Sequence, residues 1–143
     1  MSADGTDDWT ELVDDGFIGL VGPIIFAKPV DGVHRFRFTA ERKHKNRSGF
    51  VQGGMLMTFA DRCLGNTARA ERPTRSQATM QFNIHFIRPV RIGETVEMRC
   101  VVVKETRTVC FTEGKILVGD EIVANVQGVW KIITVGPKQL AVT

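Results

Sequence analysis

The chain has 143 residues, of which 43% are hydrophobic and 24% are charged, and its net charge is +3. This size and composition are typical of a globular domain with a substantial core, so residues 1–143 are predicted to form a single domain. The basic residues are scattered through expected strands and loops, which argues against a nucleic-acid partner. A mild positive charge would suit a polyanionic ligand, but many proteins without such a ligand carry the same charge.

The acidic N-terminus lacks the basic and apolar regions of a secretory signal, and no apolar run reaches membrane-spanning length. The cysteines are Cys63, Cys100 and Cys110, an odd number without Cys-x-x-Cys spacing. This pattern favours reduced structural thiols over a disulfide, a zinc site or a nucleophile. The sequence therefore predicts a cytoplasmic protein that is not a membrane protein.

The expected secondary structure combines helical and alternating patterns. Gly22 and Pro23 would end a first helix, and Asp31 with Gly32 is typical of a two-residue hairpin turn. One long helix with antiparallel strands on both sides of it in the sequence predicts an α+β domain whose sheet wraps against that helix. The expected elements are a helix over residues 7–20, strands over 24–30 and 33–39, a helix over 53–70, and a meander of strands over 78–86, 94–106, 108–118 and 122–133.

The most informative segment covers residues 46–54, with the sequence NRSGFVQGG, and leads into a helix that contains Asp61. Gly53 and Gly54 at the start of this helix leave backbone N–H groups open to a ligand oxygen, and the helix dipole favours negative charge there. An enzyme needs such donors for the oxyanion of a carbonyl addition, and Asp61 is a candidate base for the attacking water. Because its neighbours in the helix are apolar, we expect Asp61 to be shielded from solvent.

Asp61 and Gly53 cannot act on the same carbonyl within one chain. Eight residues of helix separate them, about 12 Å at about 1.5 Å per residue. Attack needs reacting atoms within about 3–3.5 Å. If both residues take part in one reaction, they come from different protomers, with two antiparallel helices related by a two-fold axis. The sequence therefore predicts a homodimer with two shared sites.

Residues 46–61 resemble the Asn-x-x-Gly-x-x-His-Gly-Gly…Asp signature of hotdog-fold acyl-CoA thioesterases, specifically the phenylacetate-pathway (PaaI-like) group. Residues 79–89 resemble the next strand of that family, and the likeness covers residues 41–133. It implies the hotdog fold, an antiparallel sheet wrapped around one long central helix, here with an extra N-terminal helix. It also implies an acyl-CoA substrate, no cofactor, and a homodimer as the minimal unit of a dimer of dimers (a homotetramer). No cluster of His, Asp or Cys has the spacing of a metal site, so no metal is expected.

The resemblance also implies roles for individual residues. The Gly53 N–H would polarise the thioester carbonyl, and Asp61 would act as base or nucleophile. Asn46 would help to hold the water or the thioester, and Thr79 would hydrogen-bond the water. Gln52 stands where the family usually has His. Glutamine forms hydrogen bonds but cannot carry a proton at neutral pH, so we expect Gln52 to position and not to transfer protons.

Three further residues are candidates for substrate binding. Gly54 belongs to the same helix start as Gly53, and Phe82 could contact either an aromatic or a medium aliphatic acyl group. Arg88 is the best single candidate for a contact with the phosphates of coenzyme A. By contrast, His44 and His85 are interpreted as polar surface or strand residues rather than as catalysts.

Hydrolysis of an acyl-CoA to the free acid and coenzyme A is the favoured function. A hotdog hydratase or dehydratase would need a His–carboxylate pair in a different motif, and none is visible in the sequence. A non-catalytic acyl-CoA-binding or regulatory hotdog protein stays open because of Gln52. Asp61 argues against that alternative, because a pure binding protein needs no catalytic carboxylate. Release of the coenzyme A thiol from a panel of acyl-CoAs would distinguish these functions.

Overall fold

A computed structural model describes residues 8–133. In chain order the elements are β1 (Thr10–Glu11), α1 (Phe17–Val21), β2 (Ile25–Val30), β3 (Val33–Thr39), a 3-10 turn (Arg42–His44), α2 (Gly53–Ala68), β4 (Ser76–Phe86), β5 (Thr95–Glu105), β6 (Val109–Val118) and β7 (Glu121–Ile133). The long helix and the strands that follow it lie within a few residues of the predicted bounds. Over the described residues, no helix is both long and apolar enough to cross a membrane.

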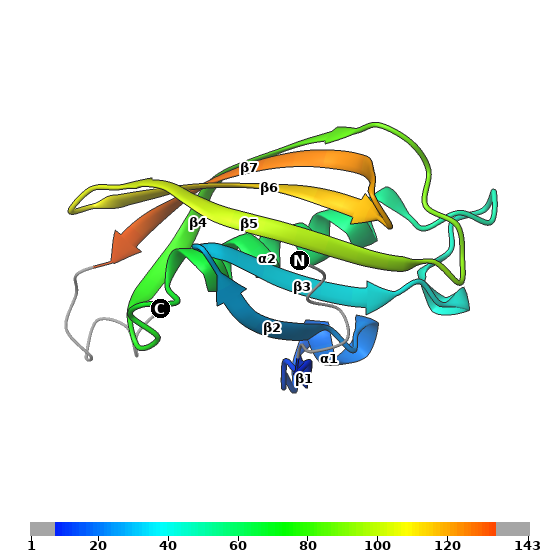
Figure 1. The fold of residues 1–143 in the computed structure, drawn as a ribbon, viewed down its shortest axis with the longest axis horizontal. Coiled ribbons are helices and arrows are strands. Elements are labelled where there is room, and N and C mark those ends of the chain that lie inside the picture. Colours follow the sequence, from blue (N-terminus) through cyan, green and yellow to red (C-terminus); the bar gives the residue numbers. More distant parts are fainter. Residues whose placement is uncertain (1–7, 134–143) are drawn as a thin grey trace.

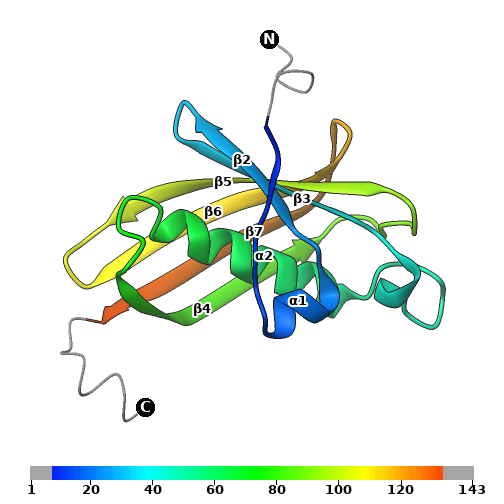
Figure 2. The same ribbon diagram turned by 90° about the horizontal axis from the view of Figure 1, so that it is seen from below.

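The strands form one antiparallel sheet in the order β1-β2-β3-β5-β6-β7-β4. The sheet curves over α2, which lies along its concave face (Figure 1). Seen from below, α2 runs along the sheet, and β1 and α1 lie in front of it (Figure 2). The predicted sheet wrapped around one long helix is confirmed.

The predicted meander is correct only for β5, β6 and β7. The strand after α2, β4, pairs with β7 at the far edge of the sheet, whereas β5 pairs with β3. The connection from β4 to β5 therefore crosses from one edge of the sheet to the other half. β4 has a partner along only one side within the described protomer. Its long pairing with β7, from Ser76↔Ile133 to Phe86↔Ala124, fixes which of its side chains face α2.

The core lies between the concave face of the sheet and α2. Alternate residues of each central strand point to this side, as the period of two in a β-strand requires. In β3, for example, Phe36 and Phe38 are buried, and the Phe38 ring meets Phe59 of α2 edge-on at 4.7 Å between ring centroids. The cysteines are free and buried; burial raises the pKa of each thiol, that of Cys100 to about 12. The fully buried members of the core include Ile24, Phe59, Leu64, Val90, Val96, Met98, Ile116 and Val123.

The N-terminal segment differs from the prediction of a helix over residues 7–20, whose first residue lies outside the described part. A short strand, β1, pairs with β2, and the helix begins only at Phe17. Asp14 Oδ1 accepts a hydrogen bond from Gly16 N at 2.7 Å, a local turn that competes with helix. Apolar spacing was misleading here, because Val13 and Leu20 are 89% and 73% exposed. The extra N-terminal helix exists, but it is only five residues long.

Candidate active site

The loop before α2 is shaped by the side chain of Asn46. Its Oδ1 accepts hydrogen bonds from Ser48 N at 2.9 Å and from Phe50 N at 3.1 Å. Gly49 completes the turn with a φ of +88°, a conformation that favours glycine. The oxygen of Asn46 is therefore engaged in the loop, and the amide NH₂ is the end that can donate to a bound molecule.

The amino-terminal end of α2 borders an open pocket of about 420 Å³. Gln52 is the N-cap residue, and its carbonyl accepts Met55 N at 2.9 Å. The N–H groups of Gly53 and Gly54 have no carbonyl one turn earlier in the helix, and the helix dipole adds positive character at this end. A Cβ on Gly53 would lie 3.4 Å from the ring of Phe86, so glycine keeps this part of the pocket open. The residues that line this Gly53 pocket are Asn46, Ser48, Phe50, Val51, Gly53, Leu56, Phe86, Ile87, Arg88, Pro89 and Val90.

Asp61 belongs to a second, smaller pocket of about 130 Å³. Thr79 Oγ1 of β4 donates to Asp61 Oδ1 at 3.2 Å, so the structure brings these two predicted residues together. The expectation that Asp61 is shielded is wrong for the protomer, in which its side chain is exposed. The apolar neighbours of Asp61 in the helix face the sheet, whereas Asp61 lies on the flank of α2 next to β4. The residues that line this Asp61 pocket are Asp61, Arg62, Gly65, Asn66, Arg69, Gln77, Thr79 and Trp130.

The floor of the Asp61 pocket is held by buried contacts. Trp130 Nε1 donates to Thr112 Oγ1 at 2.9 Å, which fixes the indole beneath α2. A Cβ on Gly65 would lie 3.3 Å from the indole, so glycine permits this close approach. Gln77 Nε2 donates to Gly65 O at 3.0 Å. Sequence reasoning missed these residues. The spacing i, i+4, i+8 from Asp61 places Gly65 and Arg69 on its own helix face and could have indicated them.

The two pockets divide the predicted chemistry between them. Gly53 and Asn46 lie in one pocket, and Asp61 and Thr79 lie in the other. α2 runs from Gly53 to Ala68 as one continuous helix, so the rise of about 12 Å between Gly53 and Asp61 holds. A single protomer therefore holds these two groups of predicted residues in separate pockets.

Three other predicted residues have definite positions. Gln52 is exposed and makes no side-chain hydrogen bond to the helix end, which fits neither a buried acid nor a capping role. Arg88 lines the Gly53 pocket but forms ion pairs with Glu94 at 3.2 Å and Glu121 at 3.1 Å, and hydrogen bonding to Glu94 raises its pKa. Phe82 is partly buried against the core and lines neither pocket. Roles for Arg88 and Phe82 in substrate binding stay predictions.

The histidines are distributed differently from the prediction. His44 is 4% exposed, so its interpretation as a surface or strand residue is wrong. Its Nδ1 accepts Glu41 N at 2.9 Å, and its Nε2 lies 2.5 Å from the carbonyl oxygen of Val21. Both ring nitrogens are satisfied, so His44 ties the loop before α2 to α1 and is not available as a catalyst. His85 lies exposed on β4, as expected for a strand residue.

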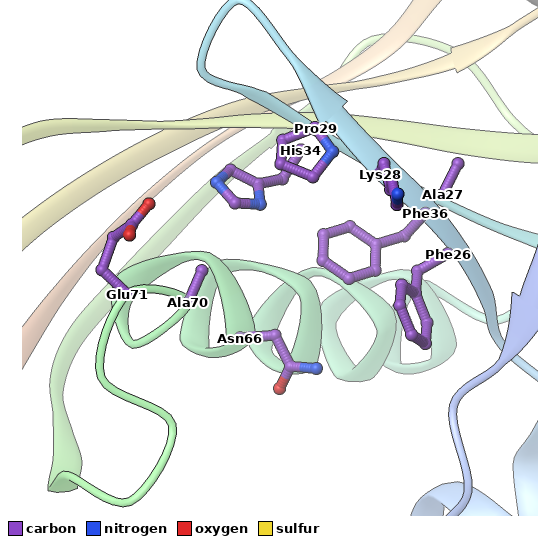
Figure 3. Close-up of a pocket in the computed structure, with 9 residues that line it drawn as sticks. All are labelled: Phe26, Ala27, Lys28, Pro29, His34, Phe36, Asn66, Ala70 and Glu71. Carbon is purple, nitrogen blue, oxygen red and sulfur yellow. The ribbon is translucent and has the colours of Figure 1, made fainter.

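A further pocket of about 300 Å³ lies between the β2–β3 hairpin and the carboxyl-terminal half of α2 (Figure 3). Its lining contains His34 and Glu71, a His–carboxylate combination that was not visible in the sequence. Burial lowers the pKa of His34, and the charge of Glu71 acts in the opposite direction. The pocket contains no helix amino terminus and therefore lacks the oxyanion donors of the Gly53 pocket. Hydratase chemistry would need such donors as well, so this pocket does not favour that alternative.

Comparison with known proteins bears on the same residues. The family model described as the thioesterase superfamily matches residues 48–124, which is more than half of the chain and includes Gly53, Asp61 and Thr79. The chain belongs to the thioesterase superfamily. This membership supports thioester hydrolysis as its general chemistry, and the predicted resemblance is confirmed at that level.

This thioesterase-superfamily chain is similar to one curated protein in sequence and to two solved structures in fold. A protein of Pseudomonas aeruginosa named as an inferred esterase is 26% identical over 116 residues, which cover 80% of this chain and 87% of that protein. A conserved Pseudomonas aeruginosa protein of known structure is 26% identical, with a TM-score of 0.77 over 84% of this chain and 95% of that one. The phenylacetic acid degradation protein PaaI of Thermus thermophilus is 19% identical, with a TM-score of 0.74 over 83% of this chain and all of the other. This last likeness concerns the fold alone.

Proposed function

We propose that this member of the thioesterase superfamily hydrolyses acyl-CoA thioesters in composite sites of a homodimer. The observation that carries the proposal is the separation of two half-sites on one protomer, the Gly53 pocket and the Asp61 pocket. Each half-site holds one part of the chemistry that a thioester hydrolase needs, oxyanion donors or a base. Two copies related by a two-fold axis would complete two sites at once.

In this proposal the thioester carbonyl oxygen binds at the Gly53 N–H of one protomer. A water molecule held by Thr79 and Asp61 of the other protomer attacks the carbonyl carbon, and Asp61 takes its proton. The negative oxygen that develops is stabilised by the Gly53 N–H and by the helix dipole. Collapse of the tetrahedral intermediate breaks the C–S bond and releases the acid and coenzyme A, whose sulfur leaves as a thiolate or takes up a proton. Gln52 is proposed to act through its place at the start of the helix and to transfer no proton.

The exposed edge of the sheet supports the proposed dimer. β4 spans 11 residues and has one open side in the protomer. Met80 on this strand is 59% exposed and Ile87 just after it is 53% exposed, while Met57 of α2 is 41% exposed. An open, apolar strand edge is a template for pairing with another chain. Pairing of β4 with its copy would continue the sheet and bring both copies of α2 close together.

The larger assembly and the cellular location stay part of the proposal. We propose a dimer of dimers in the cytoplasm, with no nucleic acid or membrane as partner. The exposed apolar residues of the N-terminal segment, Val13, Phe17 and Leu20, are available for a contact between dimers. Light scattering would distinguish a dimer from a tetramer.

The decisive experiment measures release of the coenzyme A thiol from acyl-CoAs that carry short, medium and aromatic acyl groups. Wild-type protein should hydrolyse at least one group of them. Asp61→Asn keeps the size of the side chain but removes the base, and it should lose at least about 10²-fold in kcat. Asp120→Asn is a matched control, because Asp120 is an exposed carboxylate in the turn between β6 and β7.

Binding measurements separate the remaining alternative. Tight binding of an acyl-CoA without hydrolysis by the wild-type protein would favour a binding or regulatory protein. Hydrolysis that survives in Asp61→Asn at the wild-type rate would contradict the assignment of the base. Equal losses in Asp61→Asn and Asp120→Asn would show that the effect is not specific to the site.

A further inference from the structure

An ion pair joins the N-terminal segment to the residue that follows Asp61. Arg62 Nη1 donates to Asp14 Oδ2 at 2.7 Å. Arg62 also lines the Asp61 pocket. Adjacent positions on a helix do not face each other, but arginine has a long, flexible side chain that reaches well beyond its own position. Without a partner elsewhere, its guanidinium could therefore turn toward Asp61.

Asp14 is held firmly enough to act as an anchor. Its second oxygen, Oδ1, accepts Gly16 N at 2.7 Å, and hydrogen bonding to Arg62 is the main cause that lowers the pKa of Asp14. The segment is fixed on both sides of Asp14. Leu12 N donates to Ile24 O at 2.8 Å, and His44 binds the carbonyl of Val21. The Asp14 carboxylate therefore has a defined position above α2.

Few charged groups surround Asp61 in the described protomer. Arg62 and Arg69 are the charged side chains that share its pocket. Arg69 is two helical turns further along, about 12 Å by helix rise, and is therefore the more distant of the two along the helix. β4 and β7 add neutral side chains only, namely Gln77, Thr79 and Trp130. Arg62 is therefore the cation nearest to Asp61 along the chain.

We propose that Asp14 is a positioning residue that holds Arg62 away from Asp61 and so leaves the Asp61 carboxylate free to accept a proton from water. This inference rests on the proposed function, in which Asp61 is the base. A guanidinium binds a carboxylate through two parallel hydrogen bonds and would occupy the oxygens that must receive the proton. Asp14 occupies the guanidinium instead. Asp14 precedes residues 48–124 and therefore lies outside the part of the chain that the family model describes.

The test is a cycle of variants with the pH dependence of kcat/KM as the readout. Asp14→Asn removes the charge, yet its side-chain oxygen can still accept Gly16 N–H. An opposite charge within about 4–6 Å lowers the pKa of a carboxylate by about 1–3. The acid limb of the profile should therefore move to lower pH by about 1 unit, and the plateau rate should fall about tenfold, because the base must first give up its ion pair.

The double variant Asp14→Asn/Arg62→Gln removes the released cation. Its acid limb should move back toward the wild-type position by at least half of the shift seen in Asp14→Asn. Asp15→Asn is the matched control, because Asp15 is an exposed carboxylate next to Asp14 in the sequence. It should leave the profile in place. Thermal unfolding of each variant checks that the fold is kept.

Several results would overturn the proposal. The proposal is wrong if Asp14→Asn has the same pH profile as the wild type, or if the acid limb of the double variant does not move back toward its wild-type position. It is also wrong if Asp15→Asn shifts the acid limb as far as Asp14→Asn does. If Asp14→Asn does not fold, Arg62→Gln alone decides. The limb should stay in place in that variant, because Arg62 is held away from Asp61. An upward shift of about 1 pH unit would show that Arg62 already lies beside Asp61 in the wild-type protein and would refute the idea.

An NMR titration of the Asp61 carboxyl carbon separates this inference from the proposed function. If wild-type protein hydrolyses no thioester but the midpoint still falls in Asp14→Asn, the function is wrong and the positioning of Arg62 is right. If wild-type protein is active and the midpoint does not move, only the positioning is wrong.

Discussion

The division of the site between two protomers can be tested by mixing two inactive variants. Gly53→Val fills the Gly53 pocket at the point where the thioester carbonyl should bind, and Asp61→Asn removes the base. A side chain at Gly53 meets the ring of Phe86 at 3.4 Å, and Phe86 is half exposed and able to move aside. Both homodimers should therefore fold, as circular dichroism and thermal unfolding would show, but neither should hydrolyse a thioester.

The expected recovery follows from the geometry of α2. Because Gly53 and Asp61 are separated by about 12 Å along one helix, each proposed site takes them from different chains. In a heterodimer, one site collects both lesions and the other collects neither. Random exchange makes half of the dimers heterodimers with one intact site each, so activity should return to about one quarter of the wild-type level.

A matched control uses two lesions that fall in the same half-site. Asp61 and Thr79 are joined by a hydrogen bond within one protomer, so Asp61→Asn and Thr79→Val should not complement each other. The activity of the mixture should be only the average of the activities of the two parent variants. Native mass spectrometry would measure the fraction of heterodimers. Absence of recovery in the Gly53→Val mixture, with heterodimers present, would refute the shared site, as would recovery in the control.

Three further outcomes are expected. Gln52→His should change the rate only modestly and should add no limb to the pH–rate profile near pH 6–7, because the exposed Gln52 side chain is not expected to transfer a proton. A new limb together with a large gain in rate would contradict this. Cys100, whose pKa burial raises to about 12, should resist a thiol reagent at pH 8 until the protein unfolds; rapid labelling of the native protein at this residue would refute its burial. Burial lowers the pKa of His34. The contribution of the neutral His34 side chain to the stability of the folded state should therefore be complete above the unfolded pKa of about 6.5, and it should be lost as pH falls through the lower folded pKa. NMR should place that titration below 6.5 and lower still in Glu71→Gln, because Glu71 raises it.

The local elements could be predicted from the sequence because their signals are local. The turn at Asp31 and Gly32 has positive φ at both residues, 52° and 77°, as an Asp-Gly hairpin requires. The helix from Gly53 follows from its apolar spacing, and the separation of Gly53 from Asp61 follows from its rise. That Thr79 and Asp61 act on the same water was implied by the family pattern alone, because no local signal places residues 18 positions apart next to each other; the structure joins them by a hydrogen bond.

Other features depend on contacts between distant segments. The position of β4 beside β7 is decided by which strand its residues match across the sheet, and the sequence order alone favoured a meander. His44 is buried where its ring meets Phe38 edge-on, and the carbonyl that its Nε2 meets belongs to Val21, 23 positions earlier. The first residues carry helical apolar spacing, but Gly16 and Gly19 weaken a helix and Asp14 supports a turn instead.

The exposure of Asp61 connects these observations. Its neighbours Phe59 and Ala60 are fully buried, so the helix is anchored against the sheet, and Asp61 lies beside the open edge of β4. A carboxylate on an open surface is surrounded by water and makes a weak, unselective base, whereas a base in a closed site meets one positioned water. The same edge exposes Met80 and Ile87, which need cover for a different reason, the removal of apolar surface from water. A second copy paired along β4 would satisfy both needs and would bring a Gly53 pocket to each Asp61.

Substitution of Met80 by Lys should therefore weaken the dimer and the activity together. Loss of the dimer with full activity per chain would mean that the site does not depend on the partner.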